Sequence, residues 1–179
     1  QKKDPRFTYL QRRNIPFVAF GRSFSPLDDQ AHWVDIDGTQ GLYSATKHLI
    51  EQGHHHIGML AWQSGSVEGD ARIAGYRRAL MTRSSSGYDE TLVVQADNSV
   101  QAGYKAASKL LKRDNPPTAL VTCSDVLAVG AMRYVQAQGL HVAVTGYDDS
   151  PMARFTEPPL TTVRLPIDKA VAEVIERLV

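Results

Sequence analysis

Apolar residues follow two different patterns along this chain. Short apolar runs rich in β-branched residues are typical of buried strands, whereas apolar residues that recur every three or four positions are typical of one helix face. The strand pattern predicts extended segments at residues 15–20, 33–36, 57–62, 91–95, 119–122, 142–145 and 160–165. The helix pattern predicts helices from residue 39 to the glycine at 53, around 73–80, over 100–111, up to 138 and after 166.

The two patterns alternate, which is typical of an α/β fold. The strand-like runs are apolar almost throughout, as expected for strands that are covered on both faces. Gly53 and Gly139 stand where two helices end, because glycine adopts a left-handed conformation there at little cost. Pro166 is placed to open the last helix, since proline is tolerated in a first turn. The predicted architecture is therefore a doubly wound parallel sheet.

The composition is that of an ordinary globular protein. Of the 179 residues, 42% are hydrophobic and 22% are charged, which argues against disorder, collagen and coiled coil. No apolar run approaches the roughly 18–20 residues that cross a bilayer. The first ten residues lack the apolar centre of a signal peptide. The single cysteine fits a reducing compartment, so a cytoplasmic location is expected.

The charge distribution shows no surface for nucleic acid. The 20 basic and 19 acidic residues leave a net charge of +1. Domains that grip phosphates usually have a clear basic excess, and the densest basic clusters, Arg12-Arg13 and Arg77-Arg78, are no denser than a solvated helix face. We therefore expect this segment not to contact DNA itself.

Polar side chains gather just after the predicted strands, where ligands bind to parallel sheets. Carboxylates accept hydrogen bonds from hydroxyls and guanidinium groups donate them, so a cleft lined by both suits a ligand with many hydroxyls. Aspartate and serine in front of a helix are also ordinary N-caps, and this alternative stays open. The residues in question are Arg22, Asp37, Asp70, Arg72, Asp97, Asn98, Ser124, Asp125, Asp148 and Asp149.

The sequence offers no positive case for catalysis. Phosphate-binding, dinucleotide-binding, nucleophile-elbow and zinc-protease motifs are absent. The histidines at 54–56 point in different directions in any regular backbone, and no second cluster completes a metal site, so a polar turn is the simpler interpretation. Cys123 ends an apolar strand, as a packed thiol would. We expect no enzyme, no cofactor and no metal.

Four segments, in this order, resemble the LacI/GalR family of bacterial transcriptional regulators. The similarity covers nearly the whole chain, and the order and spacing of the segments make it specific. The segments are Val34–Leu80 with its R-x-x-G-Y helix, Ala119–Gly139, Val144–Ser150 (VTGYDDS) and Pro158–Pro166 (PPLTTVRLP).

The resemblance implies roles for single residues. Arg72 stands where the family has its effector-binding arginine, and Asp148 stands where it has an acidic effector contact. Asn98 occupies a position where many members have an aromatic residue that stacks on the ligand. Ser124-Asp125 occupies the position of a frequent Asn-Asp pair. Asp97 and, more loosely, Arg22 complete the set of expected ligand-binding residues.

The resemblance also implies an organisation. The family fold has two similar, periplasmic-binding-protein-like lobes with the effector between them. Residues 1–37 and 164–179 would belong to one, incomplete lobe and residues 38–163 to the other, with the helix-turn-helix absent from this chain. The expected function is the sensing core of a repressor that binds a sugar-like effector, forms a homodimer and reaches operator DNA through the absent domain. A periplasmic-type sugar-binding protein is the alternative, and an enzyme on the same kind of sheet is a third.

Overall fold

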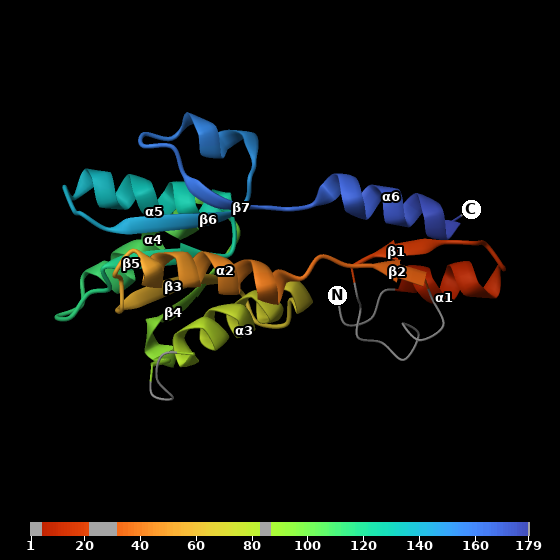
Figure 1. Cartoon of the computed structure of the whole chain (residues 1–179), viewed down its shortest axis with the longest axis horizontal. Coiled ribbons are helices and arrows are strands. Elements are labelled where there is room, and N and C mark those ends of the chain that lie inside the picture. Colours follow the sequence, from red (N-terminus) through yellow and green to blue (C-terminus); the bar gives the residue numbers. More distant parts are fainter. Residues whose placement is uncertain (1–4, 22–31, 83–86, 179) are drawn as a thin grey trace. The chain divides into compact units, whose positions relative to one another are not determined.

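The computed structural model describes residues 5–21, 32–82 and 87–178, and the chain divides into two compact units. The larger unit comprises residues 38–64 and 68–164, and the smaller unit comprises residues 1–37, 65–67 and 165–179. Each unit has a parallel sheet of its own (Figure 1).

The larger unit is built on a sheet of five strands. In spatial order these are β4 (Val93–Ala96), β3 (Ile57–Trp62), β5 (Ala119–Thr122), β6 (Ala143–Asp148) and β7 (Thr161–Arg164). Every pairing is parallel, so the carboxyl ends of the strands lie along one edge of the sheet. The central strands β3 and β5 are buried along almost their whole length, which explains their continuous apolar sequence.

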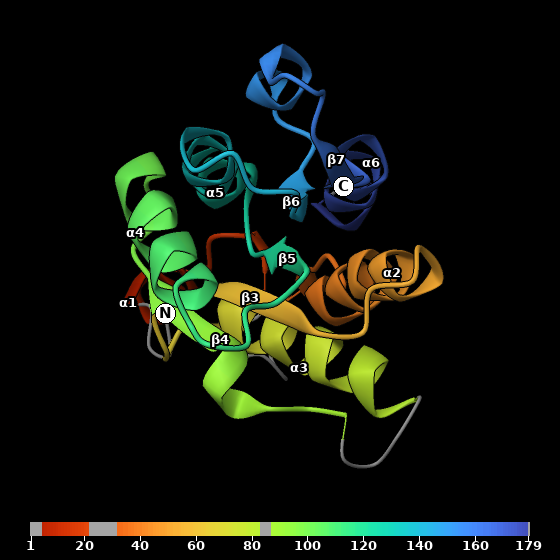
Figure 2. The same cartoon turned by 90° about the vertical axis from the view of Figure 1, so that its left-hand side faces the viewer.

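Helices cover both faces of this sheet. They are α2 (Gly38–Glu51), α3 (Val67–Met81), α4 (Val100–Leu111) and α5 (Asp125–Ala137). Helices α4 and α5 lie on one face, and α2 and α3 lie on the other (Figure 2). Two glycines let α4 and α5 approach closely: a Cβ on Gly130 would lie 2.1 Å from the carbonyl oxygen of Val100, and one on Gly103 would lie 2.4 Å from that of Leu127. The predicted α/β architecture with parallel sheets is confirmed.

The smaller unit combines a parallel strand pair with two helices. These elements are β1 (Val18–Phe20), β2 (His32–Val34), α1 (Pro5–Arg12) and α6 (Ile167–Leu178). Helix α6 contacts both strands, and the rings of Phe7 and Phe17 lie 5.5 Å apart. Within residues 5–21, 32–82 and 87–178, no helix combines the length and the apolar character that crossing a membrane requires.

Elements β3, α4 and β5 match the predicted ranges, and other boundaries differ. Helix α3 begins at Val67, before the predicted range 73–80, because Glu68 and Asp70 in its first turn favour a helix N-terminus. Strand β4 begins at Val93, since residues 90–92 form a 3₁₀ helix, η2 (Glu90–Leu92), which is capped by Asp89.

Strand β6 is longer than the predicted 142–145. It continues to Asp148 because its last residues pair with β7, where Tyr147 stands opposite Val163 and Asp148 opposite Arg164. In the smaller unit, the strands predicted at 15–20 and 33–36 are shortened to three residues each. The longer β6 makes Asp148 the last residue of a strand and not part of the turn that follows it.

Candidate functional site

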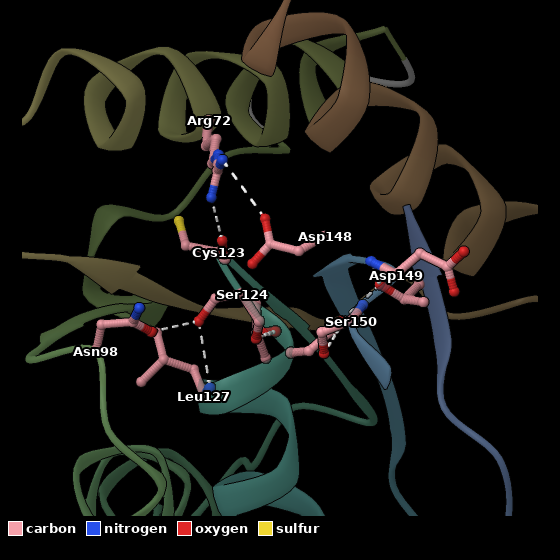
Figure 3. A network of polar contacts seen from close by, with 11 residues as sticks. Arg72, Asn98, Cys123, Ser124, Leu127, Asp148, Asp149 and Ser150 are labelled. Carbon is pink, nitrogen blue, oxygen red and sulfur yellow. Dashed lines mark hydrogen bonds and ion pairs between the residues drawn. The ribbon is translucent and has the colours of Figure 1, made fainter. Parts of the chain in front are cut away.

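The candidate site lies at the edge of the five-stranded sheet where its strands end. Arg72 reaches this edge from α3 (Figure 3). The other residues are Trp62 at the end of β3, Asp97 and Asn98 after β4, Cys123 and Ser124 after β5, and Asp148 at the end of β6. The parallel topology therefore assembles side chains that are far apart in the sequence.

Arg72 is the buried cation of this edge, with only 7% of its surface exposed. Its Nη1 donates a hydrogen bond to the carbonyl oxygen of Cys123 at 2.5 Å, and its Nη2 lies 3.8 Å from Oδ1 of Asp148. Its Nε is buried without a hydrogen-bond partner in the described part of the chain. Because buried polar groups are normally hydrogen-bonded, this guanidinium has capacity left for a ligand.

Two aromatic rings fix the position of the Arg72 guanidinium. Its Cζ lies 4.0 Å from the ring centroid of Tyr147 and 4.3 Å from that of Trp62, and such rings attract cations. Tyr147 is buried next to Gly41 of α2, where a Cβ would come within 2.5 Å of the ring. The Nε1 of Trp62 is a second buried donor without a partner among the described residues.

Asp148 has an unusual backbone φ angle and an unusual side-chain pKa. Its φ is 118° and that of Asp149 is 50°, conformations that cost energy and are often found at functional sites. Burial raises the pKa of Asp148 to about 6, although the nearby Arg72 lowers it. The carboxylate of Asp149 is held by Nε of Arg164 at 2.5 Å. Asp148 therefore changes its charge closer to neutral pH than an ordinary aspartate does.

Asp125 is fully buried, and both of its carboxylate oxygens are used within the protein. Oδ2 accepts hydrogen bonds from the backbone nitrogen and the hydroxyl of Ser150, both at 2.7 Å, and Oδ1 accepts one from the hydroxyl of Thr162 at 2.5 Å. Gly146 leaves room for this carboxylate, since a Cβ there would lie 2.3 Å from Oδ1. Asp125 thus ties α5 to β7 and to the turn that follows Asp148.

Ser124 is fully buried as well, and it forms the N-cap of α5. Its hydroxyl oxygen accepts a hydrogen bond from the backbone nitrogen of Leu127 at 3.3 Å, and the hydroxyl donates to Oδ1 of Asn98 at 2.6 Å. Asn98 is exposed. Two of the predicted candidates are therefore in direct contact (Figure 3).

The remaining candidates lie apart from these contacts. Asp97 is exposed, and Ser99 rather than Asp97 caps α4. Because the cap of α5 is likewise Ser124, the N-cap interpretation is wrong for both Asp97 and Asp125. Asp37 and Asp70 are exposed, and Arg22 lies outside the described residues.

The three consecutive histidines lie in a polar turn between α2 and β3, as the sequence predicts. Nδ1 of His54 lies 3.0 Å from the hydroxyl of Thr118, and Nε2 of His56 lies 3.1 Å from the carbonyl oxygen of Asn115. Across residues 5–21, 32–82 and 87–178, no three metal-ligating side chains come together. The contacts of His54 and His56 are thus with the protein itself.

The comparison with known proteins decides the family. A family model of the periplasmic binding protein-like domain matches residues 46–179. The structure resembles that of a regulatory protein of the LacI family from Chloroflexus aggregans, with a TM-score of 0.91 and 37% identity over 98% of this chain and 64% of that chain. This chain is a periplasmic binding protein-like domain of the LacI family. The resemblance seen in the sequence is confirmed.

Other relatives of this LacI-family domain are transcriptional regulators and not enzymes, as expected from the sequence. The HTH-type transcriptional regulator CelR of Thermobifida fusca is 37% identical over 99% of this chain and 53% of its own length. The HTH-type transcriptional repressor CytR of Escherichia coli K12 is 34% identical over 87% of this chain and 46% of its own length. The chain thus spans about half the length of these curated relatives.

Two related structures contain a sugar. A complex of the transcriptional regulator CelR with cellobiose has a TM-score of 0.89 and 37% identity, over 98% of this chain and 55% of that chain. A LacI family transcriptional regulator from Enterococcus faecium with bound ribose has a TM-score of 0.81 and 26% identity, over 94% of this chain and 63% of that chain.

Sequence reasoning missed part of the surroundings of Arg72 in this LacI-family domain. It gave Trp62 no place in the site and Tyr147 no role beyond following a strand. Both lie at the carboxyl ends of strands, Trp62 as the last residue of β3 and Tyr147 as the residue before the last of β6. Strand-end position, applied to aromatic as well as to charged residues, is the signal that finds them.

Proposed function

We propose that this LacI-family domain binds a small polyhydroxylated effector, a sugar or a sugar derivative, at the carboxyl edge of its five-stranded sheet. The observation that carries the proposal is Arg72, a buried guanidinium held by two rings and a carbonyl oxygen that keeps unused donors beside Asp148. Burial of polar groups is unfavourable unless they are hydrogen-bonded, and ligand hydroxyls would supply the missing bonds.

Arg72 and Asp148 suit the same ligand in complementary ways. The guanidinium donates hydrogen bonds and the ionised carboxylate accepts them, so neighbouring sugar hydroxyls, which do both, satisfy the two groups together. Asn98 adds an amide at the edge, and Asp97 beside it completes the polar rim. Ser124 and Asp125 belong to the site as supports, because their contacts are with the protein.

The sugar class is supported by the two relatives whose structures contain cellobiose and ribose. Transport proteins with the same fold bind sugars too. The relatives described above are regulators, however, and this favours a sensing domain over the periplasmic alternative.

A thermal-shift panel of sugars, polyols and nucleosides tests the effector class, because a ligand that binds only the folded state raises Tm. Titration calorimetry of the hits with Arg72→Ala and Asp148→Ala then tests the site. We expect each change to weaken binding about tenfold or more, as the loss of a charged hydrogen bond does. Asp114→Ala, at an exposed carboxylate after α4, is the control. Unchanged affinity in both site variants would rule out this site, and a panel without any sugar hit would rule out the sugar class.

For the whole protein we propose a cytoplasmic repressor that reaches operator DNA through a helix-turn-helix outside this chain. We also propose that residues 1–37 and 164–179 contribute to one lobe of the effector domain and that residues 38–163 form the other. The HTH-type names of the relatives support the DNA-binding part. Gel-shift titration of the full-length protein on its promoter region, with and without the sugar hit, tests it: a sugar that leaves the affinity for DNA unchanged would contradict it.

A homodimer is the assembly we propose for the full-length protein. It is supported by exposed apolar side chains on the 3₁₀ helix η3 (Pro151–Phe155), where Phe155 is 89% exposed and Met152 37% exposed. Exposed apolar patches often mark contact surfaces between proteins. Sedimentation analysis should give a dimer for the wild type and a monomer for Phe155→Asp, and a wild-type monomer would contradict the proposal.

A further inference from the structure

We propose that Asn98 is a specificity-determining residue whose amide nitrogen, oriented by Ser124, donates hydrogen bonds to oxygen atoms of the ligand. The site would then prefer a hydroxylated group over a flat aromatic ring at this point. The inference rests on the proposed function, since it requires a ligand at the carboxyl edge of the sheet.

The first step is the hydrogen-bond pattern of Ser124. Its hydroxyl oxygen caps α5 by accepting from the backbone N–H of Leu127. A serine hydroxyl has one proton to give, and here the acceptor is Oδ1 of Asn98 at 2.6 Å. The side chain is fully buried, so its proton is committed to Asn98 rather than to a ligand.

The second step is the orientation that this imposes on the Asn98 amide. Because Oδ1 faces the Ser124 hydroxyl, the amide nitrogen lies on the other side, turned away from Leu127 (Figure 3). In the described part of the chain this nitrogen has no hydrogen-bond partner, and Asn98 is exposed at the edge that also carries Arg72 and Asp148. Two N–H donors are therefore available at a fixed place.

The third step is the chemistry that such a side chain selects. Sugar hydroxyls and ring oxygens accept hydrogen bonds from an amide, whereas the face of an aromatic ring is better matched by another ring. A ligand that lacks hydrogen-bond acceptors leaves these donors unpaired, and the site therefore binds that ligand more weakly. Because Asn98 presents amide N–H donors at this edge, it shifts the preference of the site towards oxygen-rich ligands.

Calorimetric titration with cellobiose tests this inference in the purified chain. We expect Asn98→Ala and Ser124→Ala each to weaken binding about tenfold, the worth of one good hydrogen bond. If Ser124 acts through Asn98, the double variant should be no weaker than Asn98→Ala alone, because effects within one chain of contacts are not additive. Ser124→Thr keeps the hydroxyl and should restore binding.

Ser99→Ala is the matched control, since Ser99 caps α4 at the same edge and its hydroxyl accepts from Ala102. It removes a comparable cap and should leave the affinity unchanged. If Ser99→Ala and Ser124→Ala weaken binding equally, or if the Ser124 and Asn98 effects simply add, the orienting role of Ser124 is overturned.

Specificity has its own readout. We expect Asn98→Phe to lower the affinity ratio of cellobiose over uridine about tenfold, and an unchanged ratio overturns the inference.

The variant Arg72→Ala distinguishes failure of the proposed function from failure of this inference. If the wild type binds cellobiose and Arg72→Ala does not, but Asn98→Ala binds normally, only the present inference fails. If wild type and Arg72→Ala behave alike, the proposed site and this inference fail together.

Discussion

The guanidinium carbon of Arg72 lies 4.0 Å from the ring centroid of Tyr147, and the two residues come from different layers of the domain. Arg72 is on α3 and Tyr147 is on β6. The ring attracts the cation, and its face restricts how the planar group can turn. Trp62 adds a second ring at 4.3 Å. The shape of the arginine is therefore part of the site, together with its charge.

Replacing Arg72 by lysine keeps the charge and removes the planar fork. We expect the affinity for the sugar effector to fall about tenfold or more, as for Arg72→Ala, because lysine has no counterpart of the buried, unpartnered Nε donor. Calorimetric titration measures the change. Arg78→Lys is the matched control, since Arg78 also lies over a tyrosine ring, that of Tyr43 at 4.3 Å, but is exposed. Equal affinities of Arg72→Lys and wild type would mean that charge alone suffices.

Gly41→Ala tests whether the Tyr147 ring supports Arg72. A Cβ at this position would lie 2.5 Å from the ring, so the ring has to move. We expect the free energy of unfolding to fall by about 1–3 kcal/mol, the usual cost of overpacking, and sugar binding to weaken with it. Urea denaturation and titration measure the two effects. Gly58→Ala is the control, because its Cβ would overpack Leu110 at 2.9 Å rather than the Tyr147 ring, so it should destabilise the domain and leave the affinity unchanged. Full affinity in a destabilised Gly41→Ala would show that the ring packs without positioning Arg72.

The acidity of Asp148 predicts a pH dependence of effector binding. Burial raises its pKa from 3.8 to about 6. If the ionised carboxylate accepts hydrogen bonds from the ligand, the ligand favours the ionised form, and binding weakens as the pH falls through 6. We expect affinity at pH 5 to be about tenfold lower than at pH 7, since about nine tenths of the carboxyl is protonated at pH 5. Asp148→Asn should bind weakly at both pH values.

The same shift has the opposite effect on stability. Between pH 4 and 6 the folded state keeps a proton on Asp148 that the unfolded state has released, so the contribution of Asp148 to the free energy of unfolding falls as the pH rises through this window. Asp148→Asn should remove this contribution, which urea denaturation at pH 4, 5 and 6 measures. An affinity that is constant or higher at pH 5, or a dependence of stability on pH that is the same in Asp148→Asn and in the wild type, contradicts the assignment to this carboxyl.

The parts of the fold that depend on periodicity alone could be predicted from the sequence. Strand β3 is a continuous apolar run because both of its faces are buried, and α4 shows apolar residues at helical spacing between a serine cap and a proline pair. The ends of β6 and α3 could not be predicted in this way. The end of β6 depends on the pairing of Asp148 with Arg164 of the neighbouring strand. The start of α3 lies in a polar segment, where the apolar spacing of a helix is not visible.

The sequence predicts that the candidate site lies at the carboxyl edge of the sheet. It does not predict which of the residues there face a ligand and which hold other residues in place. The strand-end rule brings Asn98, Ser124, Asp125 and Asp148 into one list, because all of them stand at a strand end or up to three residues beyond it. It cannot distinguish an oxygen that faces solvent from one that accepts from Thr162, since that contact joins residues 37 positions apart. The support given to Arg72 by aromatic rings is likewise a property of the packing.

Asp125→Asn tests the supporting role of the buried carboxylate in the large unit. An amide has one acceptor oxygen where the carboxylate has two, so at least one of the bonds from the two Ser150 donors and Thr162 is lost. Because the group is fully buried and the lost partner stays unsatisfied, we expect the free energy of unfolding to fall by about 2–3 kcal/mol. Thr162→Val removes one donor to this carboxylate and the long hydrogen bond that the hydroxyl accepts from the backbone nitrogen of Asp149, and it should cost about 1–2 kcal/mol. Asp114→Asn, at an exposed carboxylate, should cost nothing. If Asp125→Asn and Asp114→Asn unfold at the same urea concentration, the carboxylate does not hold the turn that carries Asp148.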